Sequence, residues 1–502
     1  MTPPLRRSGP PLGGPAQELI DSGFALESAD APFLHDGLNL ADVAHTLDLL
    51  RRGIIPEPAA RDLLRLLLEV HEMPIEDFPY NPEFGEPYNS RERFFVERLG
   101  KTAGWLHAGR PRREAARIAL RIHVRDQLLE LVDQVVKFAR DTTALAGRHV
   151  DTLIPDQTYL QQAQPSTFGH YVLSFVYPAV RDARRLLDEF DDINRSPGGA
   201  GCVNGTRLLD DRTHVATALG FGEVIEHTRD AMWQIDGLIH VLTSASSLLS
   251  TQSKLAEDLE IWSSVEFDFV DLADAYSRSS ILMPQKRNPY SLSIVRGASG
   301  VLIGRLTGFL AVAKSPSARS DNLIFAYGEV PRALDLAIRV TRLMAGVMRT
   351  LEVNVEQMAR GLDTGYTQAT DLTEFIVQTC GVDYRSAYEV VGRTIREASR
   401  QGVAGRLITG AMLDQAATAE TGVSWGLAAT DLSASLDPRA IIETRRATGG
   451  AAPAAVASMI RQCQQQADEL DAEVAQRRQT LDRAEQRLLE QARLVAGGGS
   501  DD

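Results

Sequence analysis

Two long apolar segments flank the stretch Ser277-Arg278-Ser279-Ser280-Ile281-Leu282-Met283-Pro284-Gln285-Lys286-Arg287-Asn288-Pro289, which is the most informative part of the 502-residue chain. Hydroxyl groups, a proline turn, a lysine and an asparagine come together in this short loop. A loop that precedes a long helix can bind an anion, because free backbone N–H groups and the helix dipole both favour negative charge there. Taken alone, the loop could equally cap the following helix. The stretch therefore predicts long helices on both sides and a candidate anion site where they meet.

Helical periodicity dominates the chain on both sides of this loop. From Val124 onward, apolar residues recur in steps of four and three, at Leu128, Leu131, Val135 and Phe138. Comparable long stretches cover residues 230–250, 292–312 and 331–362. These stretches exceed the usual helix length of about 11–12 residues, and long helices need long partners, so we expect a central bundle. Alternating strand patterns are scarce, and the predicted fold class is all-α.

The chain divides into a tail and three helical regions. Residues 1–14 are rich in proline and glycine and predict a disordered tail. Residues 15–117 predict an N-terminal domain of short helices, and residues 118–366 predict the central bundle that carries the loop. Residues 367–502 predict a C-terminal helical domain that ends in a charged, heptad-like helix.

Composition narrows the functional class. The net charge of −14 argues against a nucleic-acid or anionic-membrane partner, so an anionic substrate needs a local cationic pocket. The three cysteines, Cys202, Cys380 and Cys463, are far apart and form no CxxC pair, which favours a reducing compartment. The sequence contains no run of eighteen apolar residues, so it predicts no membrane span. Its histidines show no metal-ligand spacing. We therefore expect a cytoplasmic protein without a metal site.

The loop resembles the Ser-Ser-x-Met-Pro-x-Lys-x-Asn signature of the fumarase/aspartase superfamily. Its continuation, Asn288–Gly297, resembles the argininosuccinate lyase branch of that superfamily. Further blocks agree in the same order along the chain, at Leu106–Arg110, Gln162–His170, Ala256–Leu259 with Ile261–Ser264, and Ala369–Leu372. The similarity runs from about residue 38 to about residue 475. Several separate blocks in one order make a chance resemblance implausible.

The resemblance implies a β-elimination. A base removes the proton on the carbon next to a carboxylate, the carbanion is held as an aci-carboxylate dianion, and the amine leaves from the neighbouring carbon. Such a site must stabilise charge that develops only during the reaction. By resemblance, Ser280 is the base on a loop that closes over substrate, and Lys286 and Asn288 stabilise the carboxylate. No cofactor is implied.

Substrate contacts are also implied by the resemblance. The implied substrate-binding set consists of Arg112, Arg113, Thr158, Gln164, Ser279, Met283 and Tyr327. Thr158 matches a threonine that hydrogen-bonds the fumarate part, and Arg112 matches an arginine of a family loop. Arg113 could hold an extra carboxylate of the substrate or could be a surface arginine. Tyr327 falls in the block that holds the amine part, in a register that also includes Arg319 and Ile324.

The sequence departs from the argininosuccinate lyase pattern at a coupled pair. The family's Thr-His pair reads Thr158-Tyr159, and the glutamate that pairs with the histidine reads Ser293. Two interpretations follow: either catalysis is lost, or the acid step has changed with the leaving amine. In the second case a basic amine departs already protonated, or Tyr159 donates the proton. Retention of Ser280, Lys286, Asn288 and Thr158 favours the second interpretation.

The sequence therefore predicts a reversible carbon–nitrogen lyase that converts an N-substituted aspartate into fumarate and an amine other than arginine. The amine pocket is partly apolar where the family has polar groups, which disfavours arginine. An aminopolycarboxylate such as ethylenediamine-disuccinate is a candidate substrate. A genuine argininosuccinate lyase and a non-catalytic protein of the same fold are the alternatives. Family sites combine blocks from three subunits, so we expect a homotetramer with shared active sites.

Overall fold

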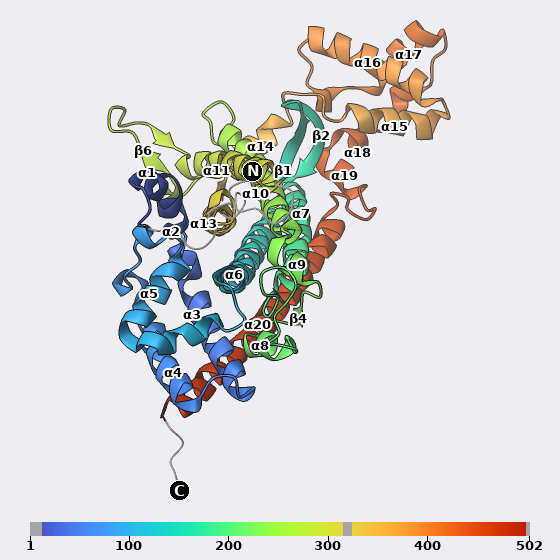
Figure 1. Ribbon diagram of the computed structural model, residues 1–502. Coiled ribbons are helices and arrows are strands. Elements are labelled where there is room, and N and C mark those ends of the chain that lie inside the picture. Colours follow the sequence, from blue (N-terminus) through green and yellow to red (C-terminus); the bar gives the residue numbers. More distant parts are fainter. Residues whose placement is uncertain (1–12, 315–323, 498–502) are drawn as a thin grey trace, which may run out of the picture.

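The computed structural model describes residues 13–314 and 324–497, and long helices dominate them (Figure 1). The predicted all-α fold class is confirmed. The predicted tail at residues 1–14 lies almost entirely outside the described residues. Arg319 also lies outside them.

Short helices form the N-terminal region. They are α1 (Gln17–Leu19), η1 (Ile20–Phe24), α2 (Ala25–Ser28), α3 (Ala31–Arg51), α4 (Glu57–His71), η2 (Ile75–Asp77), η3 (Pro82–Phe84), α5 (Pro87–Leu99) and η4 (Gly100–His107). Helix α3 is longer than the sequence pattern predicts and contacts the central bundle through α6. A buried ion pair, Arg91 to Asp42 at 3.0 Å, ties this region together.

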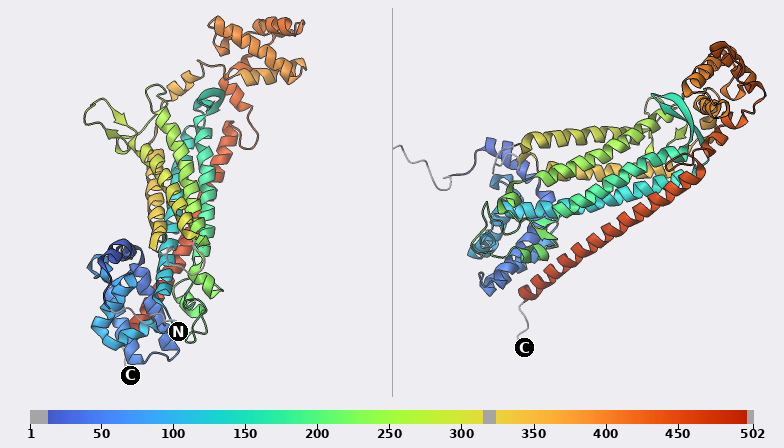
Figure 2. Two further views of the ribbon diagram at one scale, coloured as in Figure 1. Left: turned by 45° about the horizontal axis from the view of Figure 1, so that its top comes forward. Right: turned by 90° about the vertical axis from the view of Figure 1, so that its right-hand side faces the viewer.

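Five long helices form the bundle: α6 (Arg112–Arg148), α7 (Phe168–Ile193), α10 (Asp236–Trp262), α11 (Tyr290–Ala313) and α13 (Glu329–Thr350). The periodic apolar residues of α6, including Leu128, Leu131 and Val135, are fully buried in its core. Burying these rows removes apolar surface from water, which is the main favourable term in folding. The bundle is elongated, and its helices run nearly side by side (Figure 2).

Short elements connect the bundle helices. They are β1 (Leu153–Thr158), β2 (Gln161–Thr167), β3 (Arg195–Ser196), α8 (Thr213–Ala218), β4 (Glu223–Val224), α9 (Thr228–Trp233), β5 (Val270–Asp271), η5 (Asp274–Tyr276), β6 (Arg278–Ser279), β7 (Arg287–Asn288), β8 (Glu352–Val353) and α14 (Val355–Gly361). The stretches expected to be continuously helical at 230–250 and 331–362 are each interrupted. The second breaks after Thr350, because residues 352–353 pair with β5 and Asn354 caps a new helix.

The C-terminal region forms a small helical group and a returning helix. The group contains α15 (Ala369–Cys380), α16 (Tyr384–Arg400), η6 (Gly405–Leu407), α17 (Gly410–Thr421), η7 (Leu427–Ala429), α18 (Ser433–Leu436) and α19 (Pro438–Glu443), with an apolar cluster of its own. The 45-residue α20 (Pro453–Gly497) then runs back along the bundle and contacts α6, α7 and α4 (Figure 2). The three-region division stays a prediction, and α6 already begins at Arg112, before the predicted boundary.

Helix α11 is unusually exposed for its composition. Among the described helices it is the one long and apolar enough to cross a membrane by length and composition, with a mean hydropathy of 1.3. Only 28% of that window is buried. One such helix is weak evidence for a membrane span, because core helices of soluble proteins meet the same criterion.

Candidate active site

The signature loop forms a hairpin at the edge of the molecule (Figure 1). Strands β6 and β7 pair antiparallel, with Arg278 opposite Asn288 and Ser279 opposite Arg287. The Ser280 N–H donates to the Lys286 carbonyl at 3.3 Å, and the Met283 N–H donates to Ser280 Oγ at 3.0 Å. The structure thus brings five predicted site residues together in this hairpin: Ser279, Ser280, Met283, Lys286 and Asn288.

The Met283 N–H matters for the chemistry of Ser280. A serine hydroxyl is a weak base unless its surroundings favour the alkoxide, and a hydrogen bond donated to its oxygen does so. The Asn288 side-chain amide donates to the Arg278 carbonyl at 3.0 Å and closes the base of the hairpin. Arg287 anchors the same base through ion pairs with Asp271 at 2.8 Å and Asp274 at 3.1 Å.

The tip of the hairpin is open to solvent in the single chain. The Ile281 side chain is fully exposed, at 105%, and Leu282 is nearly so. Large apolar side chains at full exposure are costly, and contiguous ones mark an interaction site. The tip therefore has the character of a surface that another chain or a substrate covers.

A second hairpin, β1–β2, carries Thr158, Tyr159 and Gln164. Thr158 pairs with Gln161, which leaves Tyr159 and Leu160 as a two-residue turn with φ of 55° and 58°. Such left-handed pairs suit glycine and asparagine, and other residues pay a steric cost there. The turn presents the Tyr159 side chain at 98% exposure. Thr158 and Gln164 are exposed as well.

Arg112 and Arg113 lie at the first turn of α6, among N-terminal segments. Arg112 Nη1 donates to Asn89 Oδ1 at 2.9 Å, and its Nε lies 2.5 Å from Glu86 Oε1. The Arg113 guanidinium lies 5.7 Å from the centre of the Trp233 ring. A cation at this first turn sits against the helix dipole, so nearby acidic groups offset its charge.

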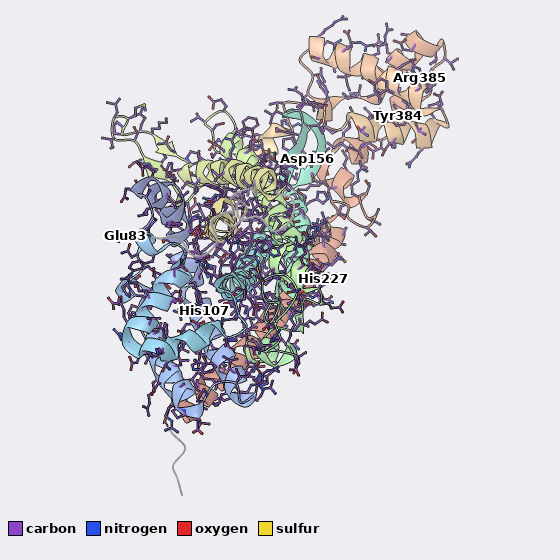
Figure 3. All side chains as sticks on the ribbon, in the orientation of Figure 1. Glu83, His107, Asp156, His227, Tyr384 and Arg385 are labelled. Carbon is purple, nitrogen blue, oxygen red and sulfur yellow. The ribbon has the colours of Figure 1, made fainter. Side chains whose placement is uncertain are left out.

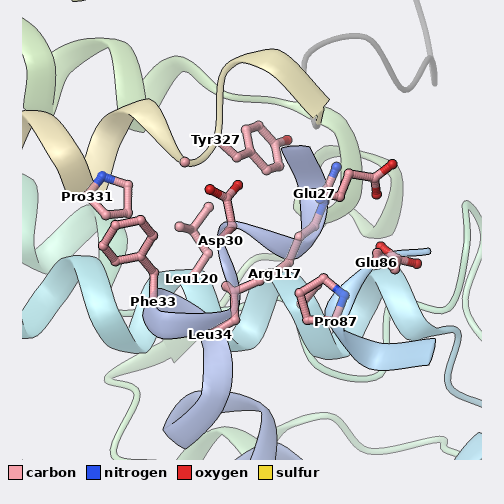
Figure 4. Close-up of a pocket in the computed structure, with 12 residues that line it drawn as sticks. Glu27, Asp30, Phe33, Leu34, Glu86, Pro87, Arg117, Leu120, Tyr327 and Pro331 are labelled. Carbon is pink, nitrogen blue, oxygen red and sulfur yellow. The ribbon is translucent and has the colours of Figure 1, made fainter. Parts of the chain in front are cut away.

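A pocket opens next to this turn (Figure 4). It is small, with a cavity volume of about 60 Å³, and Tyr327 forms part of its wall. The Arg117 guanidinium lies 5.0 Å from the centre of the Tyr327 ring. Burial raises the pKa of the Tyr327 hydroxyl. Three acidic residues, Glu27, Asp30 and Glu86, also line it, together with apolar side chains such as Phe33 and Leu34.

One chain does not bring all predicted site residues together. Helix α6 has 37 residues and is about 55 Å long at about 1.5 Å per residue. Arg112, Arg113 and Tyr327 lie at its beginning, whereas Thr158, Tyr159 and Gln164 lie beyond its end. His107 precedes the first group in sequence and Asp156 precedes the second, and these two labelled residues are well separated in Figure 3. A site that joins these groups therefore needs more than one chain.

Sequence reasoning missed one residue that lines the pocket, Arg117. The available signal was a row of arginines at intervals of four, which places them on one face of α6: Arg113, Arg117, Arg121 and Arg125. Within residues 13–314 and 324–497, no cluster of His, Cys, Asp and Glu could hold a metal ion.

Two family models match the chain. Residues 85–304 match a model described as lyase, and residues 366–443 match a model described as argininosuccinate lyase C-terminal. The argininosuccinate lyase of Methanothrix thermoacetophila is 32% identical over 455 residues, which cover 90% of this chain and 91% of the relative. That of Methanosarcina acetivorans is 30% identical over 491 residues, which cover 97% and 98%.

Solved structures give a similar result. The structures of an EDDS lyase with formate and of an EDDS lyase variant with fumarate each superpose with a TM-score of 0.87. Each is 28% identical to this chain and covers 97% of both chains. A class II fumarase from Schistosoma mansoni has a TM-score of 0.70 at 13% identity, covering 86% of this chain and 96% of its own, which shows the shared fold alone.

Proposed function

Because the chain belongs to the argininosuccinate lyase-like branch of the fumarase/aspartase superfamily, we propose that it releases fumarate from an N-substituted aspartate whose amine is not arginine. The family resemblance expected from the sequence is confirmed, and the chain is a carbon–nitrogen lyase of this superfamily. The identity of the amine and the roles of the individual residues are part of the proposal.

The observation that carries the proposal is the hydrogen bond from the Met283 N–H to Ser280 Oγ at 3.0 Å. It supports Ser280 as the base, because it stabilises negative charge on the oxygen that must take the proton. Ser280 removes the proton from the carbon next to one substrate carboxylate. The electron pair moves into that carboxylate as the aci-carboxylate dianion, and Lys286 and Asn288 stabilise the added charge.

The second step breaks the carbon–nitrogen bond. The electron pair returns from the aci-carboxylate, the double bond of fumarate forms, and the amine nitrogen takes a proton. In the proposed mechanism Tyr159 donates that proton, because the turn holds its side chain away from its own chain. Arg112 and Thr158 bind the fumarate part, with Arg113, Gln164, Ser279, Met283 and Tyr327 completing the substrate contacts.

The absence of the family's His-Glu pair, replaced here by Tyr159 and Ser293, supports an amine other than arginine. Ser293, which stands where the family has a glutamate, hydrogen-bonds Glu260 Oε1 at 3.3 Å rather than the turn at Tyr159. The similarity to EDDS lyase supports an aminopolycarboxylate, such as ethylenediamine-disuccinate, as the substrate class. Genuine argininosuccinate lyase remains the alternative that the curated relatives favour.

Helix α11 supports a homotetramer with shared sites. Its exposed apolar residues include Ile294, Val301, Ile303 and Leu310. Four glycines on the helix, Gly297, Gly300, Gly304 and Gly308, would each accept a Cβ without meeting any atom of the described chain within 4 Å. Small residues on an apolar face let helices approach closely, so α11 can pack against copies of itself. The acidic charge and three free cysteines support a soluble, cytoplasmic location.

The test follows fumarate by its absorbance as the purified protein acts on ethylenediamine-disuccinate and on argininosuccinate. We expect release from the first substrate and a loss of about 100-fold or more in kcat for Ser280→Ala, since general-base catalysis contributes about that factor. Ser277→Ala is the matched control, because the Ser277 hydroxyl donates to a backbone carbonyl outside the loop tip and should have little effect.

Each other outcome points to a defined alternative. Undiminished activity of Ser280→Ala removes Ser280 from the base role. Efficient turnover of argininosuccinate alone establishes the ordinary argininosuccinate lyase. Release of fumarate from neither compound, together with no fumarate binding by calorimetry, supports a non-catalytic protein of this fold.

A further inference from the structure

The pocket beside the first turn of α6 contains a buried cation whose charge is not neutralised by a carboxylate. Arg117 is only 5% exposed, and its Nε donates to the Met232 carbonyl. In the described part of the chain, no hydrogen-bond acceptor reaches its two terminal nitrogens. Burial lowers the pKa of this guanidinium, with the neighbouring Arg113 adding to that effect. A buried, unpaired charge is strongly unfavourable, so the site is built to receive an anion.

The neighbouring arginines of the same row are satisfied differently. Arg121 donates to the carbonyls of Asp192 and Ile193, at 3.1 and 3.0 Å. Arg125 donates to the Asn194 side chain at 3.0 Å and to a backbone carbonyl. These hydrogen bonds join α6 to the connection that follows α7, so Arg121 and Arg125 have a structural role. Arg117 has no comparable partner for its terminal nitrogens, although it lies on the same helix face.

Aromatic rings hold the Arg117 side chain in place. Its guanidinium centre lies 5.0 Å from the centre of the Tyr327 ring and 5.3 Å from that of Trp233. Cation–π contacts and the bond to Met232 fix the plane of the guanidinium before any ligand binds. A fixed guanidinium with two free nitrogens matches the two oxygens of a carboxylate. Arg117 lines the pocket, near Tyr327 and Glu27 in Figure 4.

The acidic residues of the pocket are mostly neutralised. Asp30 pairs with Arg332 at 2.7 Å, and Glu86 pairs with Arg112 at 2.5 Å. Glu27 forms no ion pair among the described residues, and burial, followed by the nearby Glu86, raises its pKa. The pocket thus offers one uncompensated cation, Arg117, and one acid, Glu27, that can face a cationic group.

We propose that Arg117 determines substrate specificity by binding a carboxylate on the leaving amine, so that the amine is itself an amino acid. The inference rests on the proposed lyase function and names the substrate class of the same site. Glu86 connects the two regions, because it lines the pocket and also pairs with Arg112, the residue proposed to bind the fumarate part. Glu27 faces the cationic nitrogen of the same amine. A leaving amine without a carboxylate would leave the Arg117 charge buried and unpaired.

The test measures addition of amines to fumarate by the full-length protein, in pairs that differ only by a carboxylate. The pairs are 2,3-diaminopropionate with ethylenediamine, arginine with agmatine, and glycine with methylamine. In each pair that reacts, we expect a kcat/KM roughly tenfold or more higher for the carboxylated amine, as a charged hydrogen-bonded pair provides. In Arg117→Met this preference should disappear, through a higher KM for the carboxylated member alone.

Two further variants make the result specific. Tyr327→Phe should keep the preference for the carboxylated amine, because its ring still holds the guanidinium. Arg140→Met should behave as wild type, because Arg140 lies on the same helix outside the pocket and pairs with Asp468 and Asp471. If circular dichroism shows that Arg117→Met does not fold, the preference of the wild type for the carboxylated amine in each pair still tests the proposal.

The outcomes separate the two levels of the proposal. Equal use of both members of each pair by the wild type, or an equal loss for both in Arg117→Met, overturns the role of Arg117 and leaves the lyase function standing. Consumption of fumarate with none of the amines, together with no release from any N-substituted aspartate, overturns the proposed function itself.

Discussion

Tyr159 stands where the family pattern that this chain resembles has the histidine of a Thr-His pair. Its hydroxyl is presented to solvent by a strained turn, and no other acid of the described chain stands in that turn. If Tyr159 donates the proton to the departing amine, Tyr159→Phe should lower kcat by about 100-fold and change KM little, since general-acid catalysis contributes about that factor. Steady-state fumarate release measures this.

The control for this prediction is Tyr384→Phe, another exposed tyrosine, on α16, which should leave the rate unchanged. An unchanged kcat in Tyr159→Phe would show instead that the amine leaves already protonated. The two interpretations of the missing acid pair are thereby distinguished at one side chain.

Glu114 links the Arg112 turn to the glycine loop that follows β3. It is buried, and its two carboxylate oxygens accept the N–H groups of Gly199 and Gly201, each at 2.7 Å. Burial raises its pKa from 4.5 to about 7. Between these values the unfolded chain has lost the proton that the folded chain keeps, so stability falls as pH rises from about 4.5 to about 7.

The difference of about 2.5 pKa units corresponds to about 3 kcal/mol of unfolding free energy. We therefore expect the stability of the wild type, relative to Glu114→Gln, to decline by about that amount between pH 4.5 and pH 7. Urea unfolding at a series of pH values measures the difference. For Glu97→Gln, at an exposed position, the unfolding free energy should vary with pH in the same way as that of the wild type. If the unfolding free energy of Glu114→Gln also varied with pH as that of the wild type does, the raised pKa of Glu114 would be contradicted.

At the level of elements, the sequence predicts the long helices well and the short strands poorly. Apolar residues repeat over many turns in α6, so the period is unambiguous. Two-residue strands such as β6 and β7 have too few residues to show a period, and their pairing depends on contacts remote in sequence. The site residues of the signature loop could be named by resemblance, whereas Arg117 could not, because its role depends on packing against Tyr327 and Trp233.

The β1–β2 turn yields a prediction about a single element. Leu160 has φ of 58° and is half exposed, so its side chain contributes little burial while its backbone is strained. Leu160→Gly should stabilise the folded chain by up to about 1 kcal/mol, the approximate cost of a left-handed non-glycine residue. Chemical denaturation measures the change.

Leu407→Gly is the matched control for this turn, because Leu407 is also exposed but has no positive φ. That variant should be destabilised by about 0.5–1 kcal/mol, the usual cost of added backbone freedom. Destabilisation of Leu160→Gly would mean that the leucine packs against another subunit, which would bear directly on the assembly.

At the scale of the whole molecule, the length of α6 and the exposure of α11 lead to the same conclusion. A helix of about 55 Å separates Arg112 from Thr158, so one chain cannot complete a site that contains both. Helix α11 offers a long apolar face with glycines that admit close neighbours. Packing of α11 against other copies would bring the two ends of different chains together and would cover the exposed tip at Ile281 and Leu282.

This arrangement predicts that two inactive variants restore activity when they share a tetramer. Arg112→Ala and Ser280→Ala should each be inactive alone. After joint unfolding and refolding of an equal mixture, a site drawing Arg112 from one chain and Ser280 from another has a chance of one half for each intact residue, so about a quarter of the sites should work. Recovery of about a quarter of wild-type fumarate release, with a tetrameric mass by light scattering, would support shared sites. A mixture as inactive as its components, with tetramers formed, would place both residues in one chain and would contradict the proposal of shared sites.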